Sequence, residues 1–555
     1  MNQAIYKLIK DWRIKSLQVV SKKSPAINNT PELRKWFVIV FNIMLVKTFG
    51  SAVFGVSATT ITVEVNLSSG VNFILVGLPD NAVKESQKRI VAALKNCNLA
   101  YPKQEITVNM APADIRKEGS AYDLTIALGI LAASSQVNQL DLEKYIIMGE
   151  LSLDGGLQPI KGVLPIAIQA LSEGFRGFIL PVQNAREAAI VAGLEVYGVE
   201  KLSEVVDFFN GNGELVRVEV NAEEEFAANQ GRSDVDFSDV KGQENIKRAM
   251  EVAAAGGHNI ILIGPPGAGK TMLAKRLPTV LPPLTLNEAL ETTKIHSVAG
   301  KLGKEASLVS VRPFRSPHHT ISDVALVGGG SFPQPGEISL AHNGVLFLDE
   351  LPEFKRTVLE VMRQPLEERT VTISRAKFSI EYPASFMLVA SMNPCPCGFY
   401  NHPEKECVCG PGVVQKYLNR VSGPLLDRID IHLEVTPVPF KELTSKISGE
   451  KSEDVRKRVV KARQLQAERF QGKDGVYSNS QMSTKILRSV CELTEDGAAL
   501  LKTAMEKLGL SARAYDRILK VARTIADLES SENIKTEHLA EAIQYRSLDR
   551  DGWAG

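Results

Sequence analysis

The chain has 555 residues, which is too long for one hydrophobic core and predicts three or four domains. Its 65 basic and 64 acidic residues give a formal charge of +1, so any binding of nucleic acid must be local. The chain has six cysteines, four of them between positions 395 and 409. This pattern excludes a secreted disulfide framework and indicates a reducing, cytoplasmic setting.

Residues 1–43 are predicted to form a basic leader. Only Asp11 and Glu32 oppose its cations, which are Lys7, Lys10, Arg13, Lys15, Lys22, Lys23, Arg34 and Lys35. The apolar run at 36–46 is too short to span a bilayer, and no small-residue cleavage site follows it, so we expect no membrane association. The leader is either disordered or the product of a misassigned start codon, and a nucleic-acid-binding arm is the alternative.

Residues 44–210 alternate short β-rich runs with helical stretches, which predicts an α/β or α+β domain. Strands are expected at 60–65 and 73–76, and helices at 81–95 and 124–133. Residues 211–235 are expected to be a linker, because the stretch from 221 to 233 combines acidic, polar and small residues.

A phosphate-binding loop is predicted directly after the apolar run at 259–263. Its eight positions are Gly264, Pro265, Pro266, Gly267, Ala268, Gly269, Lys270 and Thr271. The glycines let backbone N–H groups close around phosphate oxygens, Lys270 reaches the β- and γ-phosphates, and the Thr271 hydroxyl can bind Mg²⁺ at a helix start. A plain turn before a helix is the alternative, which the complete pattern after a strand argues against.

A second apolar run, at 345–348, ends in Asp349 and Glu350. Asp349 is predicted to hold the same Mg²⁺, and Glu350 is predicted to polarise the attacking water. Strands and helices alternate over 236–440, which predicts a parallel-sheet nucleotide-binding core, and the helical apolar spacing of 441–555 predicts a helical lid. The chain is therefore expected to hydrolyse ATP with Mg²⁺.

Two C-x-C pairs follow the predicted core strands, at Cys395, Cys397, Cys407 and Cys409. Four thiolates at this spacing can bind Zn²⁺, and a loop this rich in proline and glycine gains order from a metal. The spacing differs from the commoner C-x₂-C finger, so a redox pair or buried thiols are the alternatives, and His402 is a possible substitute ligand.

Around both nucleotide motifs the sequence resembles the AAA+ ATPases of the magnesium-chelatase and replicative-helicase branch, in particular the Mg-chelatase-like YifB/ComM family. The resemblance extends from about Met44 to the C terminus and rests on the order of short motifs at 76–80, 315–319, 335–340, 422–428 and 522–527. It implies an AAA+ P-loop core and a helical C-terminal lid that assemble into a hexameric ring.

The resemblance also implies roles for single residues. Asn393 occupies the place of the polar residue that senses the γ-phosphate. Arg428 matches the arginine that related enzymes insert into a neighbour's site, where it stabilises charge on the transferring phosphoryl group, and Arg420 is an alternative. Arg513 resembles the second sensor arginine, which links the lid to the nucleotide, and Arg517 is an alternative for that role.

Residues 369–380 alternate like a β-hairpin with Arg375 and Lys377 at its expected tip. In ring helicases, which the sequence resembles, such hairpins point into the pore. There, a few cations per subunit, multiplied around a ring, can grip the phosphates of DNA. A solvated charged turn is an equal alternative for these two residues.

Residues 149–162 and 178–181 resemble the proteolytic domain of Lon-type proteases, which implies a ribosomal S5 domain 2-like fold for the first domain. The active dyad is not kept, because Tyr122 and Leu164 stand where that family has its serine and lysine. Ser120 and Lys161 lie nearby, so a shifted Ser–Lys pair is an alternative. We expect the domain to serve ring assembly or substrate guidance.

The resemblance as a whole implies an ATP-driven ring motor that acts on branched or single-stranded DNA. For ComM-like proteins it implies branch migration during natural transformation. Two other classes stay open: a chelatase-type ATPase that drives Mg²⁺ insertion into a porphyrin with partner subunits, and an ATP-dependent protease. The Lon-like domain and the lack of a metal-binding partner domain argue against the first, and the degenerate dyad argues against the second.

Overall fold

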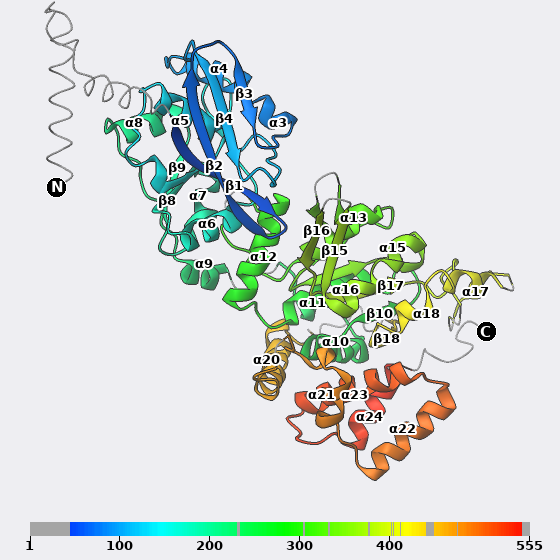
Figure 1. The fold of residues 1–555 in the computed structure, drawn as a ribbon. Coiled ribbons are helices and arrows are strands. Elements are labelled where there is room, and N and C mark those ends of the chain that lie inside the picture. The colour runs from blue at the N-terminus through cyan, green and yellow to red at the C-terminus, as the bar shows by residue number, and fades with distance from the viewer. Residues whose placement is uncertain are drawn as a thin grey trace, which may run out of the picture.

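The computed structural model describes residues 45–229, 234–303, 306–330, 333–375, 378–400, 402, 404–410, 412–439, 449–473 and 475–546. Along the chain, an α/β domain is followed by a core with a parallel sheet and then by a helical unit (Figure 1). This order confirms the multidomain α/β fold class that the sequence predicts. The leader predicted at 1–43 lies outside the described residues.

The first domain is built on a seven-stranded sheet in the order β3-β4-β2-β1-β5-β8-β9. Its strands are β1 (Val46–Phe54), β2 (Ser57–Ser68), β3 (Phe73–Val76), β4 (Glu105–Ala111), β5 (Tyr145–Ile147), β8 (Gly177–Pro181) and β9 (Glu195–Val199). The β1–β2 hairpin is antiparallel, whereas β1, β5, β8 and β9 run parallel to one another. A short second ladder joins β6 (Glu150–Leu151) to β7 (Leu157–Gln158).

Helices cover this sheet, and α5 (Asp123–Ala133), which is apolar except for Asp123 and Thr125, is buried at every position. The others are α3 (Asn81–Lys84), α4 (Ser86–Asn96), α6 (Val163–Ser172), α7 (Val182–Ala189) and α8 (Leu202–Asn210). The single helix expected at 81–95 is therefore two helices that meet at Glu85.

Part of the segment expected to be a linker is structured. Arg217 pairs with Tyr197 of β9, and Leu215, Val218 and Val220 pack against the core of the first domain. Helix α9 (Ala222–Asn229) follows and packs Phe226 into a small apolar cluster that includes Leu284 of the next unit. A few apolar side chains thus pack this polar segment against its neighbours. Residues 230–233 lie outside the described ranges.

The core has a five-stranded sheet in the order β11-β14-β17-β10-β18, with all strands parallel. The strands are β10 (Ile260–Ile263), β11 (Phe314–Arg315), β14 (Val345–Leu348), β17 (Met387–Met392) and β18 (Ile431–Glu434). Strands β10, β14 and β17 are buried along their whole length, which explains their uninterrupted apolar sequences.

The helices around this sheet include α10 (Glu244–Gly256), α11 (Lys270–Val280), α12 (Leu286–Ala299), α13 (Asp323–Val327), α14 (Glu337–Leu340), α15 (Arg356–Glu360), α16 (Arg363–Glu368), α17 (Val413–Leu418) and α18 (Gly423–Leu426). The predicted hairpin is present as β15 (Thr370–Arg375) paired with β16 (Phe378–Pro383). A minor two-stranded ladder joins β12 (Gly328–Gly329) to β13 (Gln334–Pro335).

The first domain contacts the core at several places in addition to the cluster around Leu284. Helix α6 lies against α12, where the Gly162 backbone N–H donates to the Ser297 carbonyl at 3.1 Å. The turn of the β1–β2 hairpin reaches the second hairpin, because Gly55 lies against Ile380 of β16.

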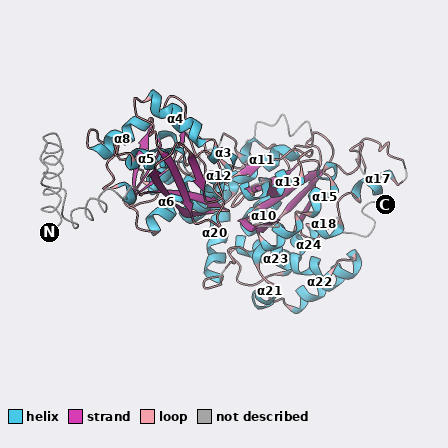
Figure 2. Ribbon diagram, turned by 45° about the horizontal axis from the view of Figure 1, so that its top comes forward, coloured by secondary structure: helices cyan, strands magenta, loops and turns pink. Residues whose placement is uncertain are grey.

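The C-terminal unit is helical, as predicted. It contains α20 (Ser452–Arg469), α21 (Thr484–Val490), α22 (Glu495–Leu508), α23 (Ala512–Leu528) and α24 (Thr536–Gln544). Helices α20 and α23 pack on α10, so one apolar core continues from the parallel sheet into the lid. Figure 2 shows the strands in two groups, while the unit with α20 to α24 is made of helices and loops. No helix in the described ranges has the length and apolarity that crossing a membrane requires.

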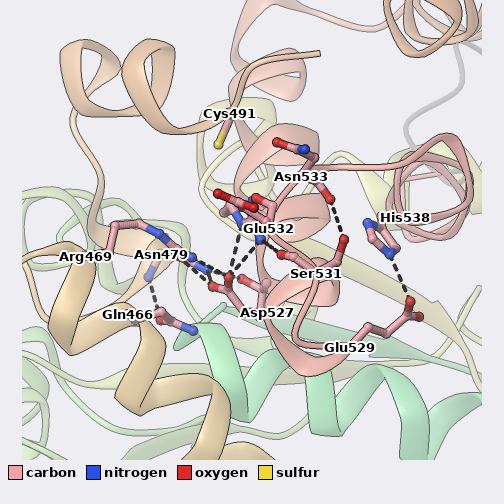
Figure 3. Close-up of polar contacts among 12 residues, drawn as sticks. Gln466, Arg469, Asn479, Cys491, Asp527, Glu529, Ser531, Glu532, Asn533 and His538 are labelled. Carbon is pink, nitrogen blue, oxygen red and sulfur yellow. Dashed lines mark hydrogen bonds and ion pairs between the residues drawn. The ribbon is translucent and has the colours of Figure 1, made fainter. Parts of the chain in front are cut away.

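A buried carboxylate holds the lid together. Asp527 of α23 is fully buried and accepts hydrogen bonds from both terminal nitrogens of Arg469, at 2.5 and 2.8 Å. The Asn479 amide donates to Asp527 at 2.8 Å, and the Arg523 Nε donates at 3.1 Å. Figure 3 shows Arg469 and Asn479 pointing at Asp527 from different segments. One charge therefore ties α20, the turn before α21 and α23 together.

We expect Asp527→Asn to lower the free energy of unfolding by about 3 kcal/mol or more, because two arginines lose a buried counter-charge. Thermal unfolding measures the effect. The matched control is Glu529→Gln, which removes the half-exposed partner of His538 and should cost less than about 1 kcal/mol. Equal stabilities of the two variants would contradict this role for Asp527.

Candidate nucleotide site

The predicted phosphate loop joins the end of β10 to the start of α11. Gly267 and Gly269 have φ of 80° and 88°, a left-handed conformation that glycine adopts without strain. Gly264 is needed for a different reason, because a Cβ there would lie 2.2 Å from the Val435 carbonyl oxygen. Pro265, Pro266 and Ala268 complete the loop. The sequence thus produces a loop whose backbone can close around phosphate.

Lys270 lies inside this loop. Its ammonium donates to the carbonyls of Gly264 and Pro265, at 2.6 and 3.0 Å, and to Asn393 Oδ1 at 3.1 Å. Burial lowers the pKa of Lys270, because the charged form has lost water, while Asp349 acts in the opposite direction. A phosphate group in the loop would supply the negative charge that this buried cation favours.

Thr271 and Asp349, both predicted as Mg²⁺ ligands, lie next to each other. The Thr271 hydroxyl donates to Asp349 Oδ2 at 2.8 Å, and Ser391 of β17 donates to the other carboxylate oxygen. A hydroxyl and a carboxylate side by side are hard oxygen ligands that suit Mg²⁺. Sequence reasoning did not identify Ser391, because it lies within an apolar strand and has no motif of its own.

Glu350 adopts a left-handed backbone with φ of 54°, which is strained for a residue other than glycine. Its side chain is half exposed, and its carboxylate lies 3.5 Å from His319 Nδ1. The His319 ring lies against that of His318, with centroids 4.1 Å apart and the planes tilted by 34°, and meets Phe354 edge-on. The Glu350 carboxylate is therefore accessible to solvent directly after the end of β14.

The four predicted chemical groups come together because of the strand order. Strands β14, β17 and β10 are adjacent and parallel, so their carboxyl ends lie at one edge of the sheet. Lys270, Asp349, Glu350 and Asn393 all follow these ends. Gln243 adds a further link at this edge, because its amide donates to the carbonyls of Ala268 and Thr436, both at 3.0 Å.

Arg428 lies at the opposite edge. Strand β18 pairs in parallel with β10, with Ile431 opposite Ile260, so a residue before Ile431 is at the amino end of the strands. The Arg428 side chain is 12% exposed and forms an ion pair with Glu367 at 2.5 Å. Arg513 is at the same edge, where it pairs with Asp427 at 3.3 Å. The fold thus places both arginines away from the phosphate loop of their own chain.

Arg420 and Arg517, the alternatives to Arg428 and Arg513, form ion pairs elsewhere. Arg420 pairs with Glu353 at 3.0 Å, close behind Glu350. Arg517 pairs with Asp430 at 2.9 Å, and Asp430 is almost completely buried between core and lid. Burial by itself would raise the pKa of Asp430, but Arg517, together with His258, holds it well below its usual range. Arg517 therefore fixes the lid to the core.

The four cysteines of the C-x-C pairs are close in space. Their sulfur atoms all lie within 4.8 Å of one another, and the contacts among Cys395, Cys397 and Cys407 range from 3.3 to 3.8 Å. This cluster, which also contains Cys409, has the donor set of a tetrahedral zinc site. His402 does not join it through Nδ1, which accepts the backbone N–H groups of Glu404 and Lys405.

The Lon-like dyad has no counterpart in the first domain. Tyr122 is buried and donates to the Ser51 carbonyl at 3.0 Å, and Leu164 is buried in α6. The shifted pair is not formed either. Ser120 donates to Glu150, whereas the aliphatic part of Lys161 packs against Gly300 at the end of α12.

The two cations predicted at the hairpin tip are Arg375 and Lys377. Arg375 is the last residue of β15, and Lys377 lies outside the described residues.

The three parts of the chain match magnesium chelatase families. Residues 236–443 match magnesium chelatase, subunit ChlI, residues 63–184 match subunit ChlI of Mg-chelatase, and residues 449–546 match the C-terminal part of subunit ChlI. A shorter similarity, 32% identity over 159 residues, relates 26% of this chain to 27% of Lon protease 2 of Bacillus subtilis.

Longer similarities cover most of the chain. It is 47% identical over 506 residues to competence protein ComM of Haemophilus influenzae, which covers 90% of this chain and 97% of that protein. It is 45% identical over 502 residues to the uncharacterized protein YifB of Escherichia coli, which covers 90% and 96%. This extent of identity, together with the phosphate loop and its acidic partner strand, implies hydrolysis of ATP with Mg²⁺. The chain belongs to the YifB/ComM family of magnesium-chelatase-like AAA+ ATPases.

Proposed function

We propose that this chain is an ATP-driven motor, and that six identical subunits form a ring that acts on DNA. The proposal rests on one observation, which is that the predicted site residues form two groups at opposite ends of the parallel strands. Lys270, Asp349, Glu350 and Asn393 lie at one edge, whereas Arg428 and Arg513 lie at the other. In a ring, each subunit presents these two edges to different neighbours, so the arginines of one subunit complete the site of the next.

In this proposal each residue acts on a defined group. Lys270 and the loop N–H groups bind the β- and γ-phosphates, and Thr271 and Asp349 would hold Mg²⁺, which neutralises phosphate charge when bound. Glu350 accepts a proton from the water that attacks the γ-phosphorus, and the bond to the β-phosphate oxygen breaks to give ADP and phosphate. Asn393 senses the γ-phosphate, and Arg428 of the neighbouring subunit stabilises charge on the transferring group.

The hairpin supports DNA as the substrate of the motor. Strands β15 and β16 follow α16 directly, and in the sequence Arg375 and Lys377 fall between Ser374 of β15 and Phe378 of β16. A ring would repeat these cations around its pore, where they can bind phosphates although the chain is nearly neutral. The likeness to a competence protein favours branch migration of recombination intermediates during integration of incoming DNA. The six cysteines, four of which form one cluster, favour the cytoplasm as the setting.

The other two classes receive less support. The first domain does not decide against a chelatase-type subunit, because residues 63–184 match a Mg-chelatase subunit family. Identity to a competence protein over 90% of the chain favours DNA over a porphyrin. A protease needs a nucleophile and a base, but Ser120 contacts Glu150, and Lys161 packs against the end of α12.

We also propose that Cys395, Cys397, Cys407 and Cys409 hold a structural zinc ion. The loop that carries them packs on the phosphate loop, because Gly398 approaches Pro266 so closely that a Cβ would lie 2.4 Å away. A metal that orders this loop would therefore also support the backbone that binds phosphate.

Glu350→Gln should retain ATP binding but reduce turnover by about 100-fold or more, because the amide cannot accept the proton of the attacking water. Phosphate release and equilibrium nucleotide binding measure the two effects. Glu353→Gln removes a neighbouring carboxylate that pairs with Arg420 and is the matched control. Normal hydrolysis by Glu350→Gln would overturn the assignment of Glu350.

Branched DNA should accelerate ATP turnover by the intact chain, and the acceleration should fall steeply as salt is added. Turnover is compared with a four-way junction, linear duplex, porphyrin plus Mg²⁺, and casein. Stimulation by porphyrin or casein alone would favour a competing class. If none of the nucleic acids changes turnover, the DNA part of the proposal fails.

Metal analysis of the purified protein should find about one zinc per chain, as a Cys₄ site binds one ion. Cys407→Ser should lose the zinc and weaken ATP binding, whereas Cys97→Ser, which lies in the first domain, should retain both. Metal-free protein with full ATP affinity would contradict the zinc site.

A further inference from the structure

Arg428 is held inside its own subunit in a way that conflicts with action on a neighbour. One terminal nitrogen lies 2.5 Å from Glu367 Oε1, and the other donates to the Pro424 carbonyl. Within the described part of the chain, its Nε is buried without a hydrogen-bond partner. With only 12% of the side chain exposed, the guanidinium must leave this position before it can reach a nucleotide in another subunit.

The contact to Glu367 is part of a longer contact along one face of α16. Arg363 lies one turn before Glu367 on this helix and donates to the Ser422 hydroxyl at 3.2 Å. This face of α16 therefore lies along the segment from Ser422 to Arg428. The segment and the helix are far apart in the sequence, so the fold alone creates this contact.

Helix α16 leads directly into the hairpin. It ends at Glu368. The next residue, Arg369, has a left-handed φ of 57°, and β15 begins directly after Arg369. Gln364 of α16 also donates to Thr372 of β15 at 3.4 Å. A shift of α16 would thus move the base of the hairpin, which the proposed function places on DNA.

We propose that Glu367 is the positioning residue for Arg428 and couples it to the hairpin. The carboxylate holds the guanidinium in its own subunit until the phosphates of the neighbour's nucleotide replace it, and this exchange releases α16. The exchange is favourable because Glu367 is half exposed and binds weakly, whereas a triphosphate offers more charge and more acceptor oxygens. The inference rests on the proposed function, in which Arg428 acts in the neighbouring subunit.

The test compares kcat and KM for ATP, without DNA and with a four-way junction, for three variants of the full-length chain. Glu367→Gln keeps the shape of the side chain but removes its charge, so kcat without DNA should rise by about two- to fivefold, the range that a half-exposed ion pair accounts for. KM for ATP should fall as well, because the Glu367 charge no longer competes with the neighbour's triphosphate for Arg428. The ratio of DNA-stimulated to DNA-free kcat should fall, since release of Arg428 no longer moves the hairpin.

Two further variants separate positioning from folding. Glu368→Gln alters the adjacent carboxylate, which accepts from Gln364 at 2.7 Å, and should behave like the unmodified chain. Glu367→Asp restores the charge and should return kcat towards the unmodified value. A kcat for Glu367→Gln that is unchanged or lowered would overturn the inference, as would an equal rise for Glu368→Gln.

Failure of the proposed function gives a different result. Arg428→Ala and Lys270→Ala should each be inactive alone and regain turnover when mixed, because a mixed ring contains intact shared sites. If turnover is not regained, the shared site itself fails, and the role of Glu367 fails with it. If it is regained while Glu367→Gln behaves like Glu368→Gln, only the coupling is overturned.

Discussion

The direction of the five strands in the parallel sheet is the constraint on which the site depends. Because β10, β14 and β17 run the same way, the groups that follow them meet at one edge although they are far apart in the sequence. The same rule sends Arg428 to the other edge, since it precedes β18. A single subunit therefore holds all the parts of the proposed site but cannot bring them together by itself.

Two buried carboxylates fix the position of the lid, one by joining it to the core and one by joining its own helices. Asp430 sits at the start of β18 and is bound by Arg517, and Asp527 near the other end of α23 is bound by Arg469. A buried charge that loses its partner is costly, so these contacts tolerate little sliding between the segments. Helix α23 thus connects the edge that carries Arg428 with the interior of the lid.

The first domain is similar to Lon-type proteases but lacks the serine and the lysine of their dyad at the expected positions. Its sheet and α5 remain well packed, while Tyr122 and Leu164 are apolar packing or structural hydrogen-bonding residues. Lys161 contributes to the contact with α12 instead. The described contacts therefore favour a domain that supports the ATPase core. A shared fold does not by itself imply a shared activity, because activity depends on the residues of the site.

Local pattern is enough to predict the phosphate loop, the acidic pair after β14, the hairpin and the helical lid, because their spacing reflects backbone conformation and burial within a few residues. The local pattern also predicts a longer linker than the structure has. Whether a polar segment packs depends on a few apolar contacts, such as that of Phe226. Local patterns do not predict two contacts of the site, which are the hydrogen bond from Ser391 to Asp349 and the ion pair of Arg428 with Glu367. They join positions 42 and 61 residues apart in the sequence, and only the folded sheet sets which of many similar polar side chains become neighbours.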